Sequence, residues 1–145
     1  MDTLSVAHGR GVIHCDIKPH NIVCSPDDVN KPIIIDQGLA TVTGNHTESD
    51  CSRGTPGYAS VSSLRRNGEN RRPERRSNLT TLPAPHVLDD FESLIYVVEY
   101  LLRGCLPWSH LTESEDCDAL LKQQEAWVPE NAPLQEFLLY TRDRR

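Results

Sequence analysis

The sequence lacks long hydrophobic runs. No apolar stretch approaches the roughly 18 residues of a membrane-spanning helix, and we expect no membrane as a partner. The N-terminus, MDTLSVAHGRG, lacks the basic start and apolar stretch of a signal peptide. The net charge of −6 argues against bulk nucleic-acid binding, and we expect no specific nucleic acid as a partner. The 37% hydrophobic and 25% charged content is typical of a soluble globular protein, and 145 residues fit one domain.

Patterns for metal binding and disulfide bonding are absent too. The five cysteines are odd in number and include no C-x-x-C pair, and the six histidines form no H-x-x-x-H pair. Scattered thiols are typical of a reducing compartment. We therefore expect free cysteines and an intracellular location, cytoplasmic or nuclear, and neither a disulfide framework nor a zinc site is favoured.

Residues 20–36, HNIVCSPDDVNKPIIID, predict a β-hairpin. The expected strands are Asn21–Cys24 and Ile33–Ile35, separated by a turn rich in proline, aspartate and asparagine. Asp36-Gln37-Gly38 ends the second strand. We expect Gly38 to permit a backbone turn that a residue with a Cβ would resist.

Residues 41–88 are rich in Ser, Thr, Asn, Gly and Pro and are predicted to be mostly irregular. Within them, Arg65–Arg76 contains six arginines and two glutamates without apolar periodicity. We interpret residues 61–88 as a solvated, Arg-rich loop insertion. A patch for nuclear import or for an acidic partner is the alternative interpretation of Arg65–Arg76.

The most strongly predicted helix is residues 89–103, DDFESLIYVVEYLLR. Asp89 as N-cap and Glu92 three positions later have the spacing of a capping box, and Gly104 predicts the end of the helix. Apolar residues cover most of its circumference, so we expect a buried central helix. Asp90 is then a carboxylate at a buried helix N-terminus, where such a group caps something or holds a neighbouring loop.

Two shorter helices are predicted at Asp118–Trp127 and Pro133–Tyr140. Trp108 and Trp127 are expected to pack in the core. Ordinary surface positions are expected for five histidines: His8, His20, His46, His86 and His110.

The most informative stretch is GVIHCDIKPHNIV, in which Asp16, Lys18 and Asn21 lie between two short apolar runs. The predicted hairpin brings Asn21 near Asp36, and hard oxygen donors at adjacent strand ends suit Mg²⁺ alongside substrate phosphates. Lys18 would place a cation beside a transferring phosphoryl group, leaving Asp16 to accept a hydroxyl proton. A polar turn without chemistry is the alternative for this stretch taken alone.

Four motifs, in order and correctly spaced, resemble the protein kinases. HCDIKPHN, residues 14–21, resembles the catalytic loop H-R-D-L-x-x-x-N, and Asp36-Gln37-Gly38 resembles D-F-G. GTPGYAS, residues 54–60, resembles the end of an activation segment. DDFESL and LRGCLPW, residues 89–94 and 102–108, are similar to the casein-kinase-one family in particular, with fungal-type kinases as the alternative. The resemblance implies that residues 1–145 are a partial kinase domain with the fold of the C-lobe, mainly α with short β-hairpins.

The resemblance also implies a role for each matching residue. Asp16 corresponds to the catalytic base and Lys18 to the lysine that stabilises the γ-phosphate. Asn21 and Asp36 correspond to the Mg²⁺ ligands, so ATP and Mg²⁺ are the implied cofactors and a protein Ser or Thr is the implied substrate. Thr55 corresponds to the threonine that bonds to the catalytic aspartate and lysine. Structural support is implied for three more residues: the spine histidine His14, Gly38 of the D-F-G motif, and Asp90, which anchors the catalytic loop.

Some features depart from the family pattern. Cys15 stands where most of the family has arginine, and Gln37 replaces the spine phenylalanine of D-F-G. No glycine-rich loop or strand lysine is recognisable among the few residues before the catalytic loop. These departures favour an alternative function, in which an inactive pseudokinase lobe serves as a protein-binding module.

Overall fold

The computed structural model describes residues 2–44, 54–70, 84–112 and 116–144. The first part holds a helix and four short strands: α1 (Asp2–Gly9), β1 (Val12–Ile13), β2 (Ile22–Cys24), β3 (Pro32–Ile34) and β4 (Thr41–Val42), with the 3-10 turn η1 at Pro19–Asn21. The remainder is helical: α2 (Val61–Asn70), α3 (Val87–Arg103), the 3-10 turn η4 (Ser109–Leu111), α4 (Cys117–Ala126) and α5 (Ala132–Asp143). None of the described helices is long and apolar enough to cross a membrane.

The strands form two separate antiparallel pairs. In one pair β2 lies against β3, with Ile22 opposite Ile34 and Cys24 opposite Pro32. The predicted hairpin is therefore confirmed, with strand bounds shifted by one residue. The second pair joins β1 to β4 and places Ile13 opposite Thr41. Because β2 and β3 lie between β1 and β4 in the chain, this pairing brings the residues that follow β1 close to the residues between β3 and β4.

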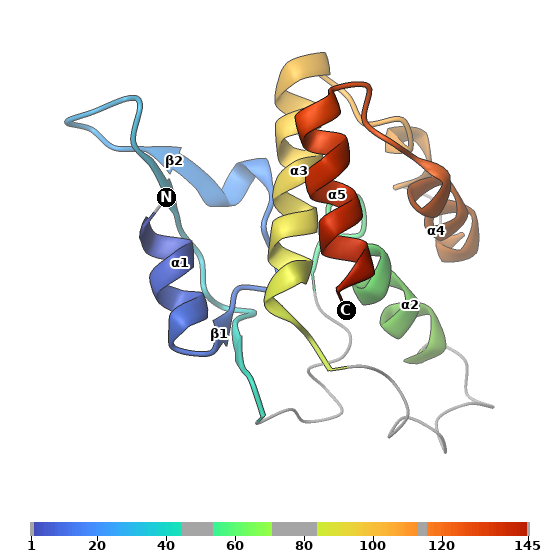
Figure 1. The fold of residues 1–145 in the computed structure, drawn as a ribbon, viewed down its shortest axis with the longest axis horizontal. Coiled ribbons are helices and arrows are strands. Elements are labelled where there is room, and N and C mark those ends of the chain that lie inside the picture. The colour runs from blue at the N-terminus through green and yellow to red at the C-terminus, as the bar shows by residue number, and fades with distance from the viewer. Residues whose placement is uncertain (1, 45–53, 71–83, 113–115, 145) are drawn as a thin grey trace.

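Helix α3 is the centre of the molecule (Figure 1), with α1 and the strands on one side and α2 and α4 on the other. Helix α5 runs alongside it. The larger core cluster forms around Ile95 and Tyr96 of α3 and includes Trp108, which is fully buried, while Trp127 packs against it. The predicted central helix and the core positions of both tryptophans are confirmed. The last turn of α3 differs, because Leu101 and Leu102 are exposed.

The start of α3 corrects the prediction. The helix begins at Val87, and its N-cap is His86 rather than Asp89. The His86 Nδ1 atom accepts the Leu88 N–H at 3.2 Å, while the Asp89 carboxylate accepts the His86 N–H at 2.8 Å. Asp89 thus occupies the third helical position of the capping box, because imidazole nitrogen can accept the helix N–H just as a hydroxyl or carboxylate oxygen does. Gly104 ends the helix in the left-handed conformation, as predicted.

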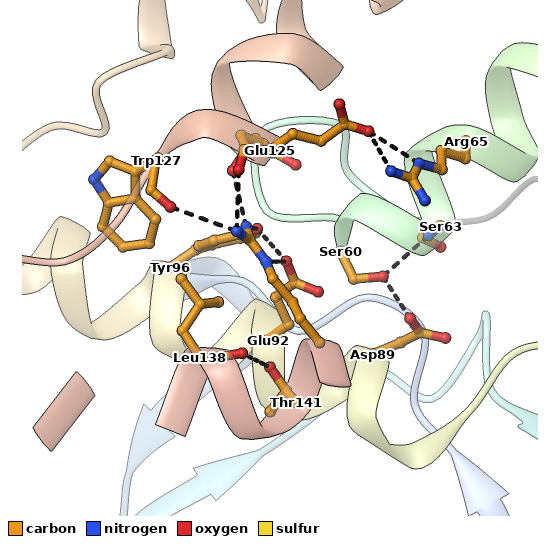
Figure 2. A network of polar contacts seen from close by, with 12 residues as sticks. Ser60, Ser63, Arg65, Asp89, Glu92, Tyr96, Glu125, Trp127, Leu138 and Thr141 are labelled. Atoms are coloured by element: carbon orange, nitrogen blue, oxygen red, sulfur yellow. Dashed lines mark hydrogen bonds and ion pairs between the residues drawn. The ribbon is translucent and has the colours of Figure 1, made fainter. Parts of the chain in front are cut away.

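The stretch predicted to be irregular, residues 41–88, contains a helix as well. Residues 61–70 of the expected Arg-rich loop form α2, which packs against α4. Figure 2 shows Arg65 of α2 reaching Glu125 of α4, with the guanidinium and carboxylate 2.7 Å apart. Arg66 is buried and pairs with Asp89 at 2.9 Å. Both arginines therefore have acidic partners within the chain, whereas residues 71–83 lie outside the described residues.

The histidine predictions hold only in part. His20 and His110 are exposed, as expected, and His46 lies outside the described residues. His8 was predicted to lie on the surface, but its side chain is only 9% exposed and bonds to Asp90. His86 is exposed but acts as the helix cap. Among the cysteines, Cys24 and Cys105 are free thiols, as predicted.

Candidate active site

A buried carboxylate holds the loop that carries the predicted catalytic residues. Asp90, at the first turn of α3, is 1% exposed. Its oxygens accept the backbone N–H of His14 at 2.8 Å, the backbone N–H of Cys15 at 2.9 Å and the ring Nε2 of His8 at 2.8 Å. Cys15 adopts a left-handed φ of 66°, which is uncommon for a residue with a Cβ. Asp90 thus compensates an unfavourable backbone conformation next to Asp16.

Asp16 receives hydrogen bonds on both carboxylate oxygens. Its Oδ1 accepts the Thr55 backbone N–H at 2.9 Å and the Thr55 hydroxyl at 2.8 Å. Its Oδ2 lies 2.7 Å from the Lys18 ammonium and 3.2 Å from the Asn21 amide nitrogen. Burial raises the pKa of Asp16, but the hydrogen bonds from Lys18 and Thr55 and the charge of Lys18 outweigh it, so the pKa is lowered. Asp16 is therefore an ionised, oriented carboxylate at neutral pH.

Thr55 connects the segment that begins at Gly54 to Asp16 and Lys18. Its hydroxyl accepts a hydrogen bond from Lys18 Nζ at 3.0 Å while it donates to Asp16. The preceding Gly54 has a φ of +99°, and a Cβ built on it would lie 2.7 Å from the Cys15 carbonyl oxygen. Only glycine allows this segment to approach the loop that carries Asp16 so closely. The motif resemblance implied the contacts of Thr55, whereas the role of Gly54 depends on the backbone and was not predicted.

The D-F-G-like segment lies beside this cluster. The Ile35 N–H donates to the Asn21 carbonyl at 2.9 Å, and a His14 ring nitrogen lies 3.1 Å from the Ile35 carbonyl oxygen. These bonds place Asp36 at the strand end next to Asn21, as the hairpin predicted. The left-handed residue of this turn is Asp36, with φ of 63°, and not Gly38, whose N–H donates to the Asp36 carboxylate at 3.2 Å. Gly38 is therefore not needed for a left-handed conformation, but a Cβ built on it would lie 3.1 Å from the Asp36 Oδ1 atom, a tight contact that agrees in part with the prediction.

The donor set of Asn21 and Asp36 fits a magnesium ion. The Asn21 amide nitrogen donates to Asp16, so its amide oxygen is the atom that can face a cation. Asp36 is exposed and supplies a carboxylate. In the described part of the chain, no three His, Cys, Asp or Glu side chains gather into a metal site. One amide and one carboxylate oxygen nevertheless match Mg²⁺, which keeps several waters and binds substrate phosphates.

Some residues of the site's framework were not predicted as such. His8 joins α1 to Asp90, and its ring packs edge-on against Phe91. Arg142 of α5 pairs with the fully buried Glu92 of α3 at 3.1 Å and bonds to the Tyr96 hydroxyl at 3.2 Å. Figure 2 shows Glu92 and Tyr96 of α3 within this network. No local pattern signals such partners, because they are 46 to 82 residues apart in the chain.

Comparison with known proteins shows which family the chain resembles. The protein kinase domain family matches residues 1–74. Casein kinase 1-like protein HD16 of Oryza sativa subsp. japonica is 32% identical over 154 residues, which cover 93% of this chain and 19% of that protein. The chain belongs to the protein kinase family. The B1 kinase of Vaccinia virus (strain Ankara) is 28% identical over 92% of this kinase chain and 42% of its own length.

The fold is that of the large kinase lobe. The structure of vaccinia related kinase 3 superimposes with a TM-score of 0.66 at 20% identity, and the match covers 97% of this chain and 45% of that one. The recognised resemblance to casein-kinase-one-like kinases and the predicted C-lobe fold are both confirmed. The chain spans less than half the length of each relative described here.

Proposed function

We propose that this chain provides the large-lobe half of a serine/threonine protein kinase active site. The observation that supports this most directly is the convergence on Asp16, where Lys18 Nζ lies 2.7 Å from one carboxylate oxygen and Thr55 donates twice to the other. Transfer of a phosphoryl group to a hydroxyl requires a base that accepts the hydroxyl proton and a cation beside the phosphoryl group.

The reaction moves the γ-phosphoryl group of ATP to a protein Ser or Thr hydroxyl. The hydroxyl oxygen forms a bond to the γ-phosphorus, the bond from that phosphorus to the bridging oxygen of ADP breaks, and Asp16 accepts the hydroxyl proton. Lys18 offsets the negative charge on the transferring group. Asn21 and Asp36 would hold Mg²⁺, which neutralises phosphate charge when bound.

Selectivity for Ser or Thr over Tyr rests on Thr55. Its hydroxyl bonds to both Asp16 and Lys18, and so draws the segment that begins at Gly54 against the catalytic loop. We propose that this close approach favours a short aliphatic hydroxyl over a phenol, because the phenol carries its oxygen farther from its own backbone.

The experiment is a transfer assay with labelled Mg·ATP and matched peptides that carry Ser, Thr or Tyr. Phosphorylation of the Ser and Thr peptides is expected when a kinase small lobe completes the nucleotide site, and replacing Asp16 with Asn should then lower the rate by on the order of 100-fold or more. Lys18→Met should also lower it. Two exposed residues supply the controls with the same chemical change, Asp27→Asn and Lys31→Met, which should leave the rate unchanged. Equal activity of Asp16→Asn and wild type would contradict the proposal.

Two substitutions favour a second candidate, a pseudokinase lobe that binds other proteins. Gln37 places an exposed amide where the family packs a phenylalanine, and Cys15 replaces the arginine that pairs with a phosphorylated activation segment. If the wild type transfers no phosphate, Gln37→Phe is the discriminating variant. Recovery of transfer in Gln37→Phe would keep the kinase proposal, whereas continued inactivity with intact folding would favour the binding module.

A further inference from the structure

The segment that carries Thr55 is held from two sides. On one side, Thr55 bonds to Asp16 and Lys18. On the other, the carbonyl oxygen of Gly57 accepts the indole N–H of Trp108 at 2.8 Å. The Thr55 carbonyl accepts the N–H groups of Tyr58 and Ala59, both at 2.9 Å, which makes residues 55–59 one tight turn. Any shift of this turn therefore moves Thr55 relative to Asp16.

Gln124 of α4 contacts the same turn. Its side chain is fully buried, and its amide nitrogen lies 3.5 Å from the carbonyl oxygens of both Pro56 and Gly57. Both partners are acceptors only, so the nitrogen and not the oxygen of the amide must face them. The two bonds are long and share one amide group, so each alone is weak.

The other end of the amide distinguishes Gln124 from a residue that only fills space. Its Oε1 is buried and has no hydrogen-bond partner within the described residues. A buried acceptor without a partner costs free energy that an apolar side chain of the same size would avoid. The N–H groups directed at the turn are the feature that methionine or leucine could not supply.

Hydrogen bonds from Arg142 also hold the backbone around Gln124 in place. Its carbonyl oxygen accepts from Arg142 at 2.8 Å, and Arg142 also bonds to the Glu125 carbonyl at 3.3 Å and the Trp127 carbonyl at 3.5 Å. Arg142 is itself held by the buried Glu92. Figure 2 shows Glu92 together with Glu125 and Trp127 around this junction. The C-terminal turn of α4 is thereby tied to the central helix.

We propose that Gln124 is a positioning residue of the phosphoryl-transfer site. It acts with Trp108 through the carbonyl groups of Pro56 and Gly57, and so sets Thr55 against Asp16 and Lys18. The inference rests on the proposed kinase function for its consequence in catalysis, while the structural coupling between α4 and residues 55–59 stands on the contacts alone.

The test compares Gln124→Met with Gln123→Met, the same change at an exposed position one residue earlier. Amide hydrogen exchange by NMR is the first readout. In Gln124→Met, the amides of Thr55, Tyr58 and Ala59 should exchange on the order of tenfold faster, because the turn opens locally. Amides of the core of α3 should keep their wild-type rates, and Gln123→Met should change neither set.

A second variant guards against misfolding of the first. Gln124→Glu keeps the size of the side chain but presents, when ionised, only acceptors to the two carbonyl groups, so it should loosen the turn at least as much as Gln124→Met. Unchanged exchange at Thr55, Tyr58 and Ala59 in both variants would overturn the proposal. Equal acceleration throughout α3 would also overturn it, since that is the result expected of a residue that only stabilises the fold.

Phosphoryl transfer is the second readout and separates the two proposals. If the wild type is active, Gln124→Met should lower kcat several-fold with little change in the KM for ATP, because Thr55 of the turn bonds to Asp16 and Lys18 rather than to the proposed Mg²⁺ ligands Asn21 and Asp36. A rise in the KM for ATP at unchanged kcat would contradict a positioning role. If the wild type is inactive, Gln37→Phe decides the proposed function as described above, and the exchange result still decides whether Gln124 holds the turn.

Discussion

The backbone N–H of Cys15 donates to the carboxylate of Asp90 at 2.9 Å, across 75 residues of sequence. The bond holds Cys15 in a left-handed conformation immediately before Asp16. The orientation of the candidate catalytic carboxylate therefore depends on the first turn of the central helix. A loop anchored in this way keeps its shape only while α3 is folded.

Replacing Asp90 with Ala should destabilise the fold by about 3 kcal/mol, because it removes the carboxylate that accepts the buried N–H of His14 and the part-buried N–H of Cys15. Asp90→Asn retains one carbonyl oxygen and should cost less. Urea denaturation followed by circular dichroism measures both. Asp27→Ala, at an exposed turn, is the control and should lie within about 0.5 kcal/mol of wild type. An Asp90→Ala variant as stable as this control would contradict the anchoring role.

Two glycines give opposite expectations for the same substitution. Gly54→Ala should destabilise by roughly 1–3 kcal/mol, since the φ is +99° and the new Cβ would meet the Cys15 carbonyl oxygen at 2.7 Å. Gly68→Ala, within α2 and with open space around it, should stabilise by about 0.5–1 kcal/mol. Thermal unfolding of the two variants decides the matter, and a Gly54→Ala variant that melts at or above the wild-type temperature would be the contrary result.

The loss of folding stability at acidic pH should depend on Asp16. Its pKa is lowered in the folded state, so the unfolded chain binds more protons over the interval between the two pKa values. The stabilisation is complete above the pKa of the unfolded chain, about 4, and is lost as the pH falls through the folded-state pKa. Asp16→Asn should therefore give a flatter dependence of unfolding free energy on pH below about pH 4. Unfolding titrations at several pH values would reveal it, and identical slopes for the two proteins would argue against it.

The pair formed by Arg142 and Glu92 should be critical for folding. Glu92 is fully buried, so Arg142→Met removes a guanidinium that pairs with a buried carboxylate, at a cost of about 3–5 kcal/mol. Arg144→Met, at the exposed end of the same helix, removes a contact with the Tyr140 ring and should cost less than about 1 kcal/mol. Chemical denaturation measures the difference, and comparable losses for the two variants would show that the buried pair contributes no more than the surface contact.

Local patterns determined much of the fold. The β-branched residues and turn formers of residues 20–36 were sufficient for the hairpin, and the apolar residues of 89–103 with Gly104 were sufficient for the central helix. The cap at His86 was missed because histidine is not among the usual capping residues. Helix α2 was missed because its sequence, VSSLRRNGEN, is polar and contains a glycine, and the helix lies against α4.

The motifs named the candidate residues of the site, and their spacing indicated the family. Asp16, Lys18, Asn21 and Thr55 do come together, and their catalytic roles stay predictions that the assays above address. Only the tertiary structure decided how these residues are held. His8, Gly54, Gln124 and Arg142 act through partners far away in sequence, and one-dimensional periodicity carries no information about which distant groups will share a buried space. The sequence by itself determined which candidate side chains are available, and long-range packing around α3 decided the geometry in which they are placed.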